Sequence, residues 1–311
     1  MMAGVASGTE LTLPVQPAAP RWPRLVSAFG PTVEILRRDR FALAGVLIYL
    51  VMFVVAILAP VLAPHDPQAV MERDGLWLTN QSPSREFPLG TTNIGRDIFS
   101  QLIYGTRPAL LVGFTAAFFV ACIGTLVGLI AGYFGGWVDT LLMRLTDVAF
   151  GIPFLPFVIV LVAFLRPNIW NIVLAMALLL WRDTARVIRS QVLTVRERAF
   201  VQAAQISGAS AWRTIFVYIA PNILSLSFLY GTLAIGWAIL TEASVSFLGF
   251  GDPTVVSWGF MLQDAYVSQA LTREAYYWFV PPGVCIMLVV MAGFFIGRGY
   301  EELLFPRLRR R

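Results

Sequence analysis

An uncharged apolar run of 23 residues, from Phe41 to Ala63, is the feature that most constrains the fold. An α-helix needs about 20 apolar residues to cross the hydrocarbon core of a bilayer, so this run is long enough to span one. Five further apolar stretches lie at about 108–133, 141–165, 168–189, 223–247 and 278–298. Because lipid cannot hydrogen-bond to the backbone, such segments must be helical. We therefore expect an all-α membrane protein with six transmembrane helices.

The composition excludes the usual soluble classes. Only 13% of the 311 residues are charged and 58% are hydrophobic, whereas a soluble domain carries about 25% charged residues. A soluble enzyme, a nucleic-acid-binding domain and a disordered protein are therefore excluded as the main class. The two cysteines, Cys122 and Cys285, lie inside apolar stretches and are predicted to be buried small residues, with neither a disulfide nor a metal role.

The positive charge predicts the orientation in the membrane. The chain has no lysine, and all 23 of its basic residues are arginines. With six spans and both termini in the cytoplasm, 17 arginines lie inside, and six lie outside: Arg73, Arg85, Arg96, Arg107, Arg166 and Arg273. Cytoplasmic loops of membrane proteins collect basic residues. The basic charge thus reflects topology, and we expect a multi-pass membrane protein in contact with lipid and with no nucleic-acid partner.

This topology divides the chain into five parts. Residues 1–40 are predicted to be a cytoplasmic N-terminal tail, 41–63 the first transmembrane helix and 64–107 an extracytoplasmic loop. Residues 108–298 form the five-helix membrane core, which includes a polar cytoplasmic loop at 196–222, and 299–311 form a basic cytoplasmic tail. Within the core, Gly113, Gly124, Gly128 and Gly132 permit close helix contact, which we assign to a partner membrane subunit. Pro153 and Pro156 predict a bend in the third span.

The sequence contains no enzyme constellation. There is no GxxxxGK[ST] phosphate loop, no HExxH and no GxSxG, and the single histidine, His65, is predicted to be a surface residue. The chain is therefore not expected to be an enzyme or to hold a cofactor or metal. If it moves a solute against a gradient, another chain must supply the energy.

The loop at 196–222 carries the most specific pattern, RERAFVQAAQISGASAWRTIFVYIAPN. A helix over 197–206 would end at Gly208, and a second over 210–219 would place apolar residues at helical spacing. Pro221 predicts a break before the next span. Such a helix pair fits either docking to a partner protein or an amphipathic segment lying on lipid.

This segment resembles the EAA loop of bacterial ABC importer permeases, in which EAA is followed after three residues by Gly and later by LPN. Gln202, Ala203, Ala204 and Gly208 fall on the pattern, with Gln202 in place of Glu and Ala220 in place of Leu. Segments 87–113, 135–156, 181–193 and 242–262 resemble the C-type permeases of dipeptide, oligopeptide and nickel importers, in the same order. The resemblance weakens in the last span.

The resemblance implies a type I ABC importer permease fold, a multi-pass location in a bacterial inner membrane and a set of partners. These are a homologous second permease, one or two ABC ATPase subunits that use ATP and Mg, and an extracytoplasmic substrate-binding protein. It implies that Gln202, Ala203, Ala204, Gly208, Ala209 and Trp212 contact the ATPase. The implied function is ATP-driven import of di- or oligopeptides by alternating access. A nickel, glutathione or sugar importer permease, or a stand-alone secondary transporter, is the alternative.

Two further groups of residues are candidate sites. Gly90, Gly95, Arg96 and Asp97 lie in the first outer loop and either dock the binding protein or make local turns and an N-cap. Glu242, Arg182 and Arg186 are candidates for lining the pathway. Glu242 is an intramembrane carboxylate, which is a functional candidate by default, although a structural hydrogen bond is an equal alternative. Arg182, Arg186 and Arg189 form one helical stripe, which either lines a pathway or faces solvent.

Overall fold

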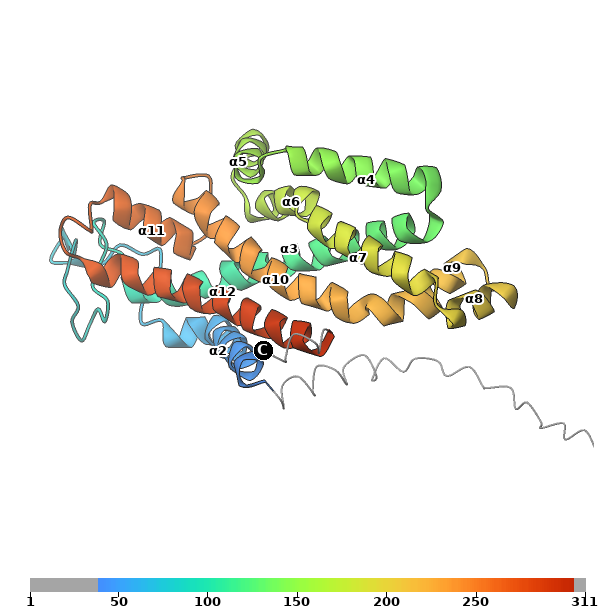
Figure 1. Ribbon diagram of the computed structural model, residues 1–311. Coiled ribbons are helices and arrows are strands. Elements are labelled where there is room, and N and C mark those ends of the chain that lie inside the picture. Colours follow the sequence, from blue (N-terminus) through green and yellow to red (C-terminus); the bar gives the residue numbers. More distant parts are fainter. Residues whose placement is uncertain (1–38, 305–311) are drawn as a thin grey trace, which may run out of the picture.

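The computed structural model describes residues 39–304, and nearly all of the elements in this part of the chain are helices (Figure 1). The predicted N-terminal tail, apart from residues 39 and 40, and residues 305–311 of the predicted C-terminal tail lie outside the described range. The elements are α2 (Arg40–Leu62), β1 (Glu72–Arg73), β2 (Leu76–Trp77), α3 (Ile98–Phe134), α4 (Gly136–Gly151), α5 (Phe154–Leu165), α6 (Ile169–Leu179), α7 (Trp181–Arg196), α8 (Ala199–Ile206), α9 (Ala211–Arg213), the π-helix η1 (Thr214–Ile219), α10 (Ala220–Phe247), α11 (Trp258–Val267) and α12 (Tyr276–Leu304).

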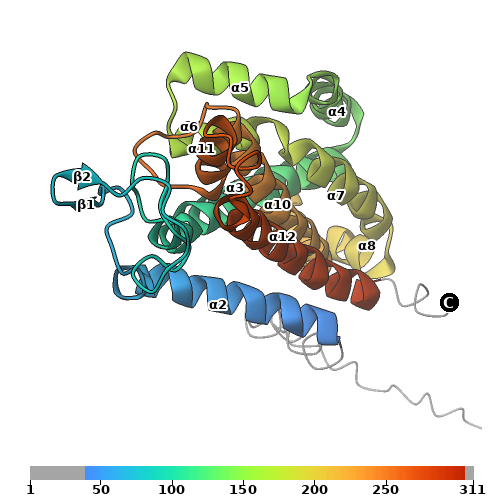
Figure 2. The same cartoon turned by 90° about the vertical axis from the view of Figure 1, so that its left-hand side faces the viewer.

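Helix α3 runs through the length of the molecule beside α10 and α12 (Figures 1 and 2). It begins at Ile98 because the carboxylate of Asp97 accepts hydrogen bonds from the backbone N–H groups of Phe99 and Ser100, at 3.3 and 3.2 Å. Residues 98–107, which were expected to belong to a loop, therefore form the first turns of this helix. At the other boundary, residues 299–304 continue α12 and do not start the expected tail.

The glycines of α3 bring helix α7 into close contact. A Cβ atom added at Gly128 would lie 2.7 Å from the Cβ of Ile188 and from the carbonyl oxygen of Ala185. Gly124 meets Thr184 and Gly132 meets Val192 in the same way. Small residues allow helix backbones to approach closely in membranes. The fourth predicted glycine, Gly113, meets Ile239 of α10. These glycines thus pack against helices of the same chain, and not against a second subunit as predicted.

Several helices are long and apolar enough to cross a membrane. Four meet this standard alone, namely Arg40–Leu62, Ile98–Phe134, Ala211–Phe247 and Tyr276–Glu302. Helices α4 and α5 meet it only together, and they are bent by 87° at a short break that contains Pro153, as the prolines predicted. The fourth expected stretch consists of two short helices, α6 and α7, which meet at Leu180. The described residues thus contain four or five spans by length and composition.

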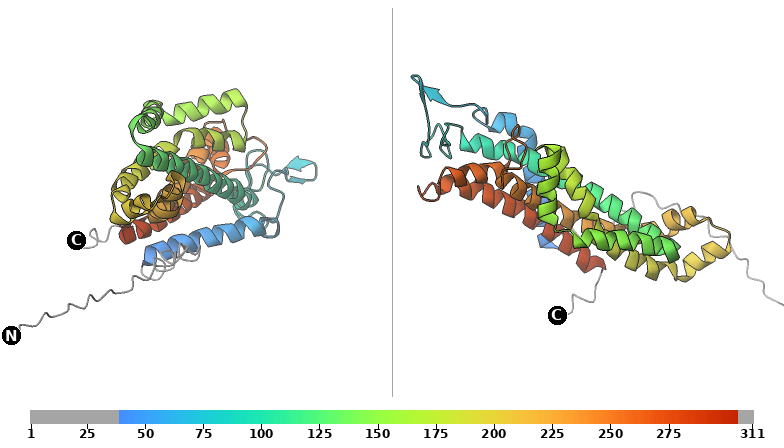
Figure 3. Two further views of the ribbon diagram at one scale, coloured as in Figure 1. Left: turned by 90° about the vertical axis from the view of Figure 1, so that its right-hand side faces the viewer. Right: turned by 90° about the horizontal axis from the view of Figure 1, so that it is seen from above.

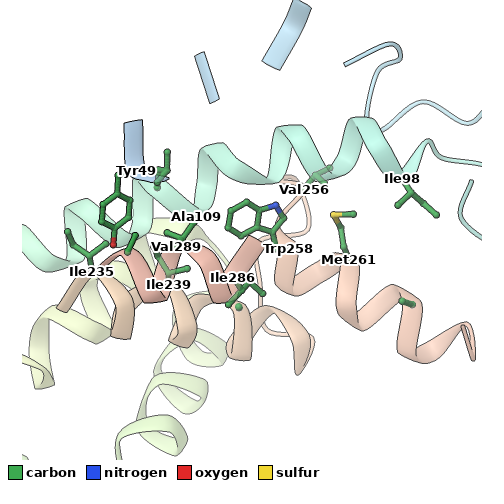
Figure 4. Close-up of a cluster of buried hydrophobic side chains, with 14 of the residues drawn as sticks. Tyr49, Ile98, Ala109, Ile235, Ile239, Val256, Trp258, Met261, Ile286 and Val289 are labelled. Carbon is green, nitrogen blue, oxygen red and sulfur yellow. The ribbon is translucent and has the colours of Figure 1, made fainter. Parts of the chain in front are cut away.

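A buried cluster joins α2, α3, α10, α11 and α12 (Figure 4). The indole of Trp258, only 1% exposed, packs against Gly105, and its Nε1–H donates to the carbonyl oxygen of Leu102 at 3.0 Å. Trp258 begins α11, a helix that the polar composition of 249–277 did not predict.

The two cysteines are free and partly buried. Figure 3 shows that α8 and α9 lie at the end of the molecule opposite the β1–β2 hairpin.

The α3–α7 contact yields a stability prediction. Replacing Gly128 with Ala should lower the free energy of unfolding by about 1–3 kcal/mol, because the new methyl group overpacks a backbone contact. The matched control is Gly231→Ala in α10, whose added Cβ would lie 3.5 Å from Ala121, an ordinary contact. Thermal unfolding of the detergent-purified variants measures the difference. Equal midpoints for the two variants would contradict the proposed importance of this contact.

Candidate functional site

The first candidate site is the short helix α8 and the turn that follows it. One face of α8 is buried, because Val201 belongs to a buried cluster with Ile215 and Ala204 is 8% exposed. The opposite face leaves Gln202 and Ala203 exposed. The three residues of the predicted QAA motif therefore divide between the two faces: Ala204 anchors the helix, while Gln202 and Ala203 are free for contact.

A glycine turn ends this helix. Gly208 has φ +83°, a backbone conformation that residues with a side chain rarely adopt. The backbone N–H groups of Gly208 and Ala209 donate to the carbonyl oxygens of Gln205 and Ala204, both at 3.0 Å, and form a Schellman cap. Nothing lies within 4 Å of a Cβ added at Gly208. Glycine is thus required here by the turn, with open space around it.

The second predicted helix exists, but it is not separate from the next span. Ser210 caps α9, and the chain continues through η1 directly into α10. In the π-helical segment the N–H of Ala220 donates to the carbonyl oxygen of Ile215, five residues back. The predicted break at Pro221 is therefore wrong. Proline is tolerated in the first turn of a helix, and the hydrogen-bond register changes just before it.

Large apolar side chains are exposed around this turn. Ile206 is 88% exposed, Trp212 56%, Phe216 49% and Phe200 40%. The rings of Trp212 and Phe216 stack with centroids 5.9 Å apart. We call these four residues, together with Gln202 and Ala203, the α8–α9 surface. An exposed apolar patch of this kind marks a site for protein or membrane contact.

The α8–α9 surface is fixed to the end of α3. The guanidinium of Arg196 donates to the carbonyl oxygens of Gly132 and Tyr133, at 3.1 and 3.3 Å. The ring of Phe134 packs edge-on against Trp212, with centroids 6.1 Å apart. Since α7 leads into α8 through Arg196, this surface is coupled to the closely packed α3–α7 pair.

The arginine stripe on α7 faces helix α4. The guanidinium of Arg189 makes two hydrogen bonds of 2.5 Å with Asp139. Arg186 pairs with Asp147 at 2.8 Å, and Arg182 donates to the carbonyl oxygen of Ala149. The predicted pathway residues Arg182 and Arg186 therefore hold α4 in place. Both also border cavities between α7 and α10.

Glu242 lies at the contact of α10 with α11. Its side chain is almost fully buried, accepts a hydrogen bond of 2.7 Å from the hydroxyl of Ser246 and interacts with Ser257. A Cβ added at Gly259 would lie 2.4 Å from the carbonyl oxygen of Ala243, so α11 packs directly on this turn of α10. These contacts favour the structural alternative for Glu242, which is not among the residues that line the three cavities described in this article.

The second predicted site lies at the hairpin end and is largely internal. Gly90, Gly95 and Asp97 are buried, and Asp97 has no exposed surface at all. In addition to capping α3, the carboxylate of Asp97 accepts a hydrogen bond of 2.5 Å from Ser100 and lies 3.3 Å from the imidazole of His65. The turn and N-cap roles therefore account for these residues, and Asp97 cannot touch a docked partner directly.

A cavity and a buried acid at this end were not predicted. The cavity, of about 580 Å³, lies between the ends of α2 and α3 and is lined by His65, Tyr104 and Arg107 among others. Burial raises the pKa of the Asp264 carboxyl, and the charge of Arg96 acts in the opposite direction. Sequence patterns did not indicate that Arg96 and Asp264 would come near each other, because Asp264 lies in the unpredicted helix α11.

The described residues do not meet the requirements of a metal site. In residues 39–304 there is no group of three His, Cys, Asp or Glu side chains that could hold a metal ion. The arrangement offers surfaces for binding. These are an exposed apolar surface at one end, cavities along α7 and α10, and an ordered loop at the other end.

Comparison with known proteins identifies the family. Residues 124–310 match the family described as binding-protein-dependent transport system inner membrane component, and residues 27–83 match the N-terminal TM domain of oligopeptide transport permease C. The chain is 35% identical to the dipeptide transport system permease protein DppC of Alkalihalophilus pseudofirmus over 91% of each chain.

Two other relatives have similar identity. The glutathione transport system permease protein GsiD of Pectobacterium atrosepticum is 34% identical over 88% of this chain and 89% of its own length. The oligopeptide transport system permease protein OppC of Bacillus subtilis is 34% identical over 88% of both. The chain belongs to the family of binding-protein-dependent transport system inner membrane components, and it is a membrane-spanning subunit of an ABC importer.

Proposed function

We propose that this chain forms the translocation pathway of an ATP-driven importer of di- or oligopeptides together with a homologous second permease. The observation that carries the proposal is the α8–α9 surface, an exposed and well-anchored apolar patch on the segment that matches the EAA pattern. Relatives named for dipeptide and oligopeptide transport support the peptide class. Glutathione, itself a peptide, remains a second candidate cargo because a glutathione permease is equally similar.

The energy comes from separate subunits. The sequence has no phosphate-binding loop, so ATP and Mg bind to partner ATPases, and the chain alone is not an enzyme. One or two kinds of ATPase subunit bind at the α8–α9 surface. A substrate-binding protein delivers cargo at the hairpin end, where the cavity of about 580 Å³ lies. Closure of the ATPases moves α8, and the α3–α7 pair carries this movement into the membrane.

In the proposed topology, six spans cross the inner membrane and both termini are cytoplasmic. The bent pair α4–α5 is the third span, and α6 with the first part of α7 is the fourth. The charges of Arg182, Arg186 and Arg189 support an α7 that continues beyond the bilayer on the cytoplasmic side. The arrangement of α8 and the hairpin at opposite ends supports placing them on opposite sides (Figure 3).

Cysteine labelling tests this topology. In a background with Cys122→Ser and Cys285→Ser, single cysteines replace the exposed residues Ser82, Pro167 and Ser207. A membrane-impermeant maleimide should label Ser82→Cys and Pro167→Cys in intact spheroplasts, but Ser207→Cys only after permeabilisation. Labelling of Ser207→Cys from outside would reverse the orientation. If Pro167→Cys did not react with the maleimide in intact spheroplasts, the proposed third and fourth spans would be contradicted.

A charge on the α8–α9 surface tests the docking role. Ile206→Glu should lower binding-protein-stimulated ATP hydrolysis of the assembled complex by about tenfold, because a buried interface anchor contributes roughly 1.4 kcal/mol or more. Ile206 is 88% exposed, so membrane insertion and thermal stability should not change. The control is Thr194→Glu, at an exposed residue of α7 that lies outside the α8–α9 surface and away from the hairpin end. Wild-type hydrolysis by the Ile206→Glu complex would exclude this surface as the ATPase contact.

A further inference from the structure

Two cavities lie next to each other along α7 and α10. The first, of about 440 Å³, is lined by Arg182, Asp183, Tyr230 and Trp237 among others. The second, of about 380 Å³, is lined by Arg186, Tyr230 and Glu301 among others. Each cavity thus contains one arginine and one carboxylate, and Tyr230 borders both. Their volumes fall in the range of small-molecule sites.

The arginines are held from outside the cavities by helix α4. The guanidinium groups of Arg182 and Arg186 lie over the ring of Phe150, at 4.8 and 4.3 Å from its centroid. Arg186 also pairs with Asp147, so its charge is already balanced. Arg182 donates to the carbonyl oxygen of Ala149 and has only a long ion pair with Asp183, at 3.8 Å, so its buried Nε makes no hydrogen bond to a described residue. The guanidinium of Arg182 is therefore held in place, and its Nε–H is a hydrogen-bond donor with no acceptor among the described residues.

The carboxylates lack cationic partners at hydrogen-bond distance within residues 39–304. Asp183 has only the 3.8 Å approach of Arg182, and Glu301 has no ion pair with a described residue. Asp183 lines the first cavity, Glu301 lines the second, and Tyr230 lines both, so its phenol stands between the two carboxylates. The adjacent Glu302 differs, because it pairs with Arg298 at 3.0 Å.

We infer that these two cavities form a binding site for the charged ends of a zwitterionic peptide, with its ammonium group between Asp183, Tyr230 and Glu301 and its carboxylate on Arg182. This inference rests on the proposed function. A charged group that leaves water must be paired, and ammonium binds to both carboxylates and aromatic faces. Two neighbouring carboxylates around one phenol allow the ammonium to pass from the first cavity to the second without losing its partner.

The test uses the assembled importer in proteoliposomes with its binding protein. The quantity measured is radiolabelled dialanine imported per ATP hydrolysed. Asp183→Asn, Glu301→Gln and Arg182→Gln should each lower this ratio about fivefold to tenfold, because each removes one charge-assisted contact with the cargo. The matched control is Glu302→Gln, the neighbouring carboxylate on the same helix, which should leave the ratio at the wild-type value.

The ratio separates a cargo site from a structural role. A variant that only weakens the fold or the assembly lowers uptake and hydrolysis together, and the ratio does not change. An unchanged ratio in Asp183→Asn and Glu301→Gln, with an active wild-type complex, would overturn the inference and leave the proposed function intact. A wild-type complex that imports no dialanine, although its binding protein stimulates hydrolysis, would overturn the peptide function and the inference with it.

Discussion

The close contact between α3 and α7 is the constraint on which the rest of the structure depends. Gly124, Gly128 and Gly132 place no side chain between the two helices, so Thr184, Ile188 and Val192 lie directly on the α3 backbone. In lipid, helices associate through packing and not through hydrophobic exclusion, which makes such backbone contacts the main attractive term. Helix α3 also contacts α2, α6 and α10, so it fixes the positions of most other helices.

Polar side chains of α7 connect this pair of helices to other parts of the molecule. On one side, the arginines of α7 hold α4 through Asp139, Asp147 and Ala149. At its end, Arg196 holds the last turn of α3 and leads into α8. The same helix thus supports the α8–α9 surface and one wall of the cavities. This arrangement explains why charged residues are concentrated in a segment that belongs to a membrane protein.

The apolar stretches predicted most of the helices, and the EAA pattern predicted the family. These signals are strong because a span needs a long uncharged run and the α8 turn needs glycine at a left-handed position. The prediction was weaker where tertiary contacts decide. Asp97 extends α3 into an expected loop, η1 removes the expected break at Pro221, and Trp258 stabilises an unpredicted α11. The cavities depend on Tyr230 and Glu301, which come together only in the fold.

The continuity of α9, η1 and α10 has a mechanical consequence. From Ala211 to Phe247 the chain is one helix of 37 residues, which at 1.5 Å per residue is about 55 Å long. Because no loop interrupts it, a force on Trp212 at one end is transmitted along the axis to the turn that contains Glu242. The π-helical segment η1 changes the hydrogen-bond register within this rod without interrupting it. Because Trp212 lies in α9 and Phe216 in η1, part of the α8–α9 surface is the end of the rod itself, with no loop between them.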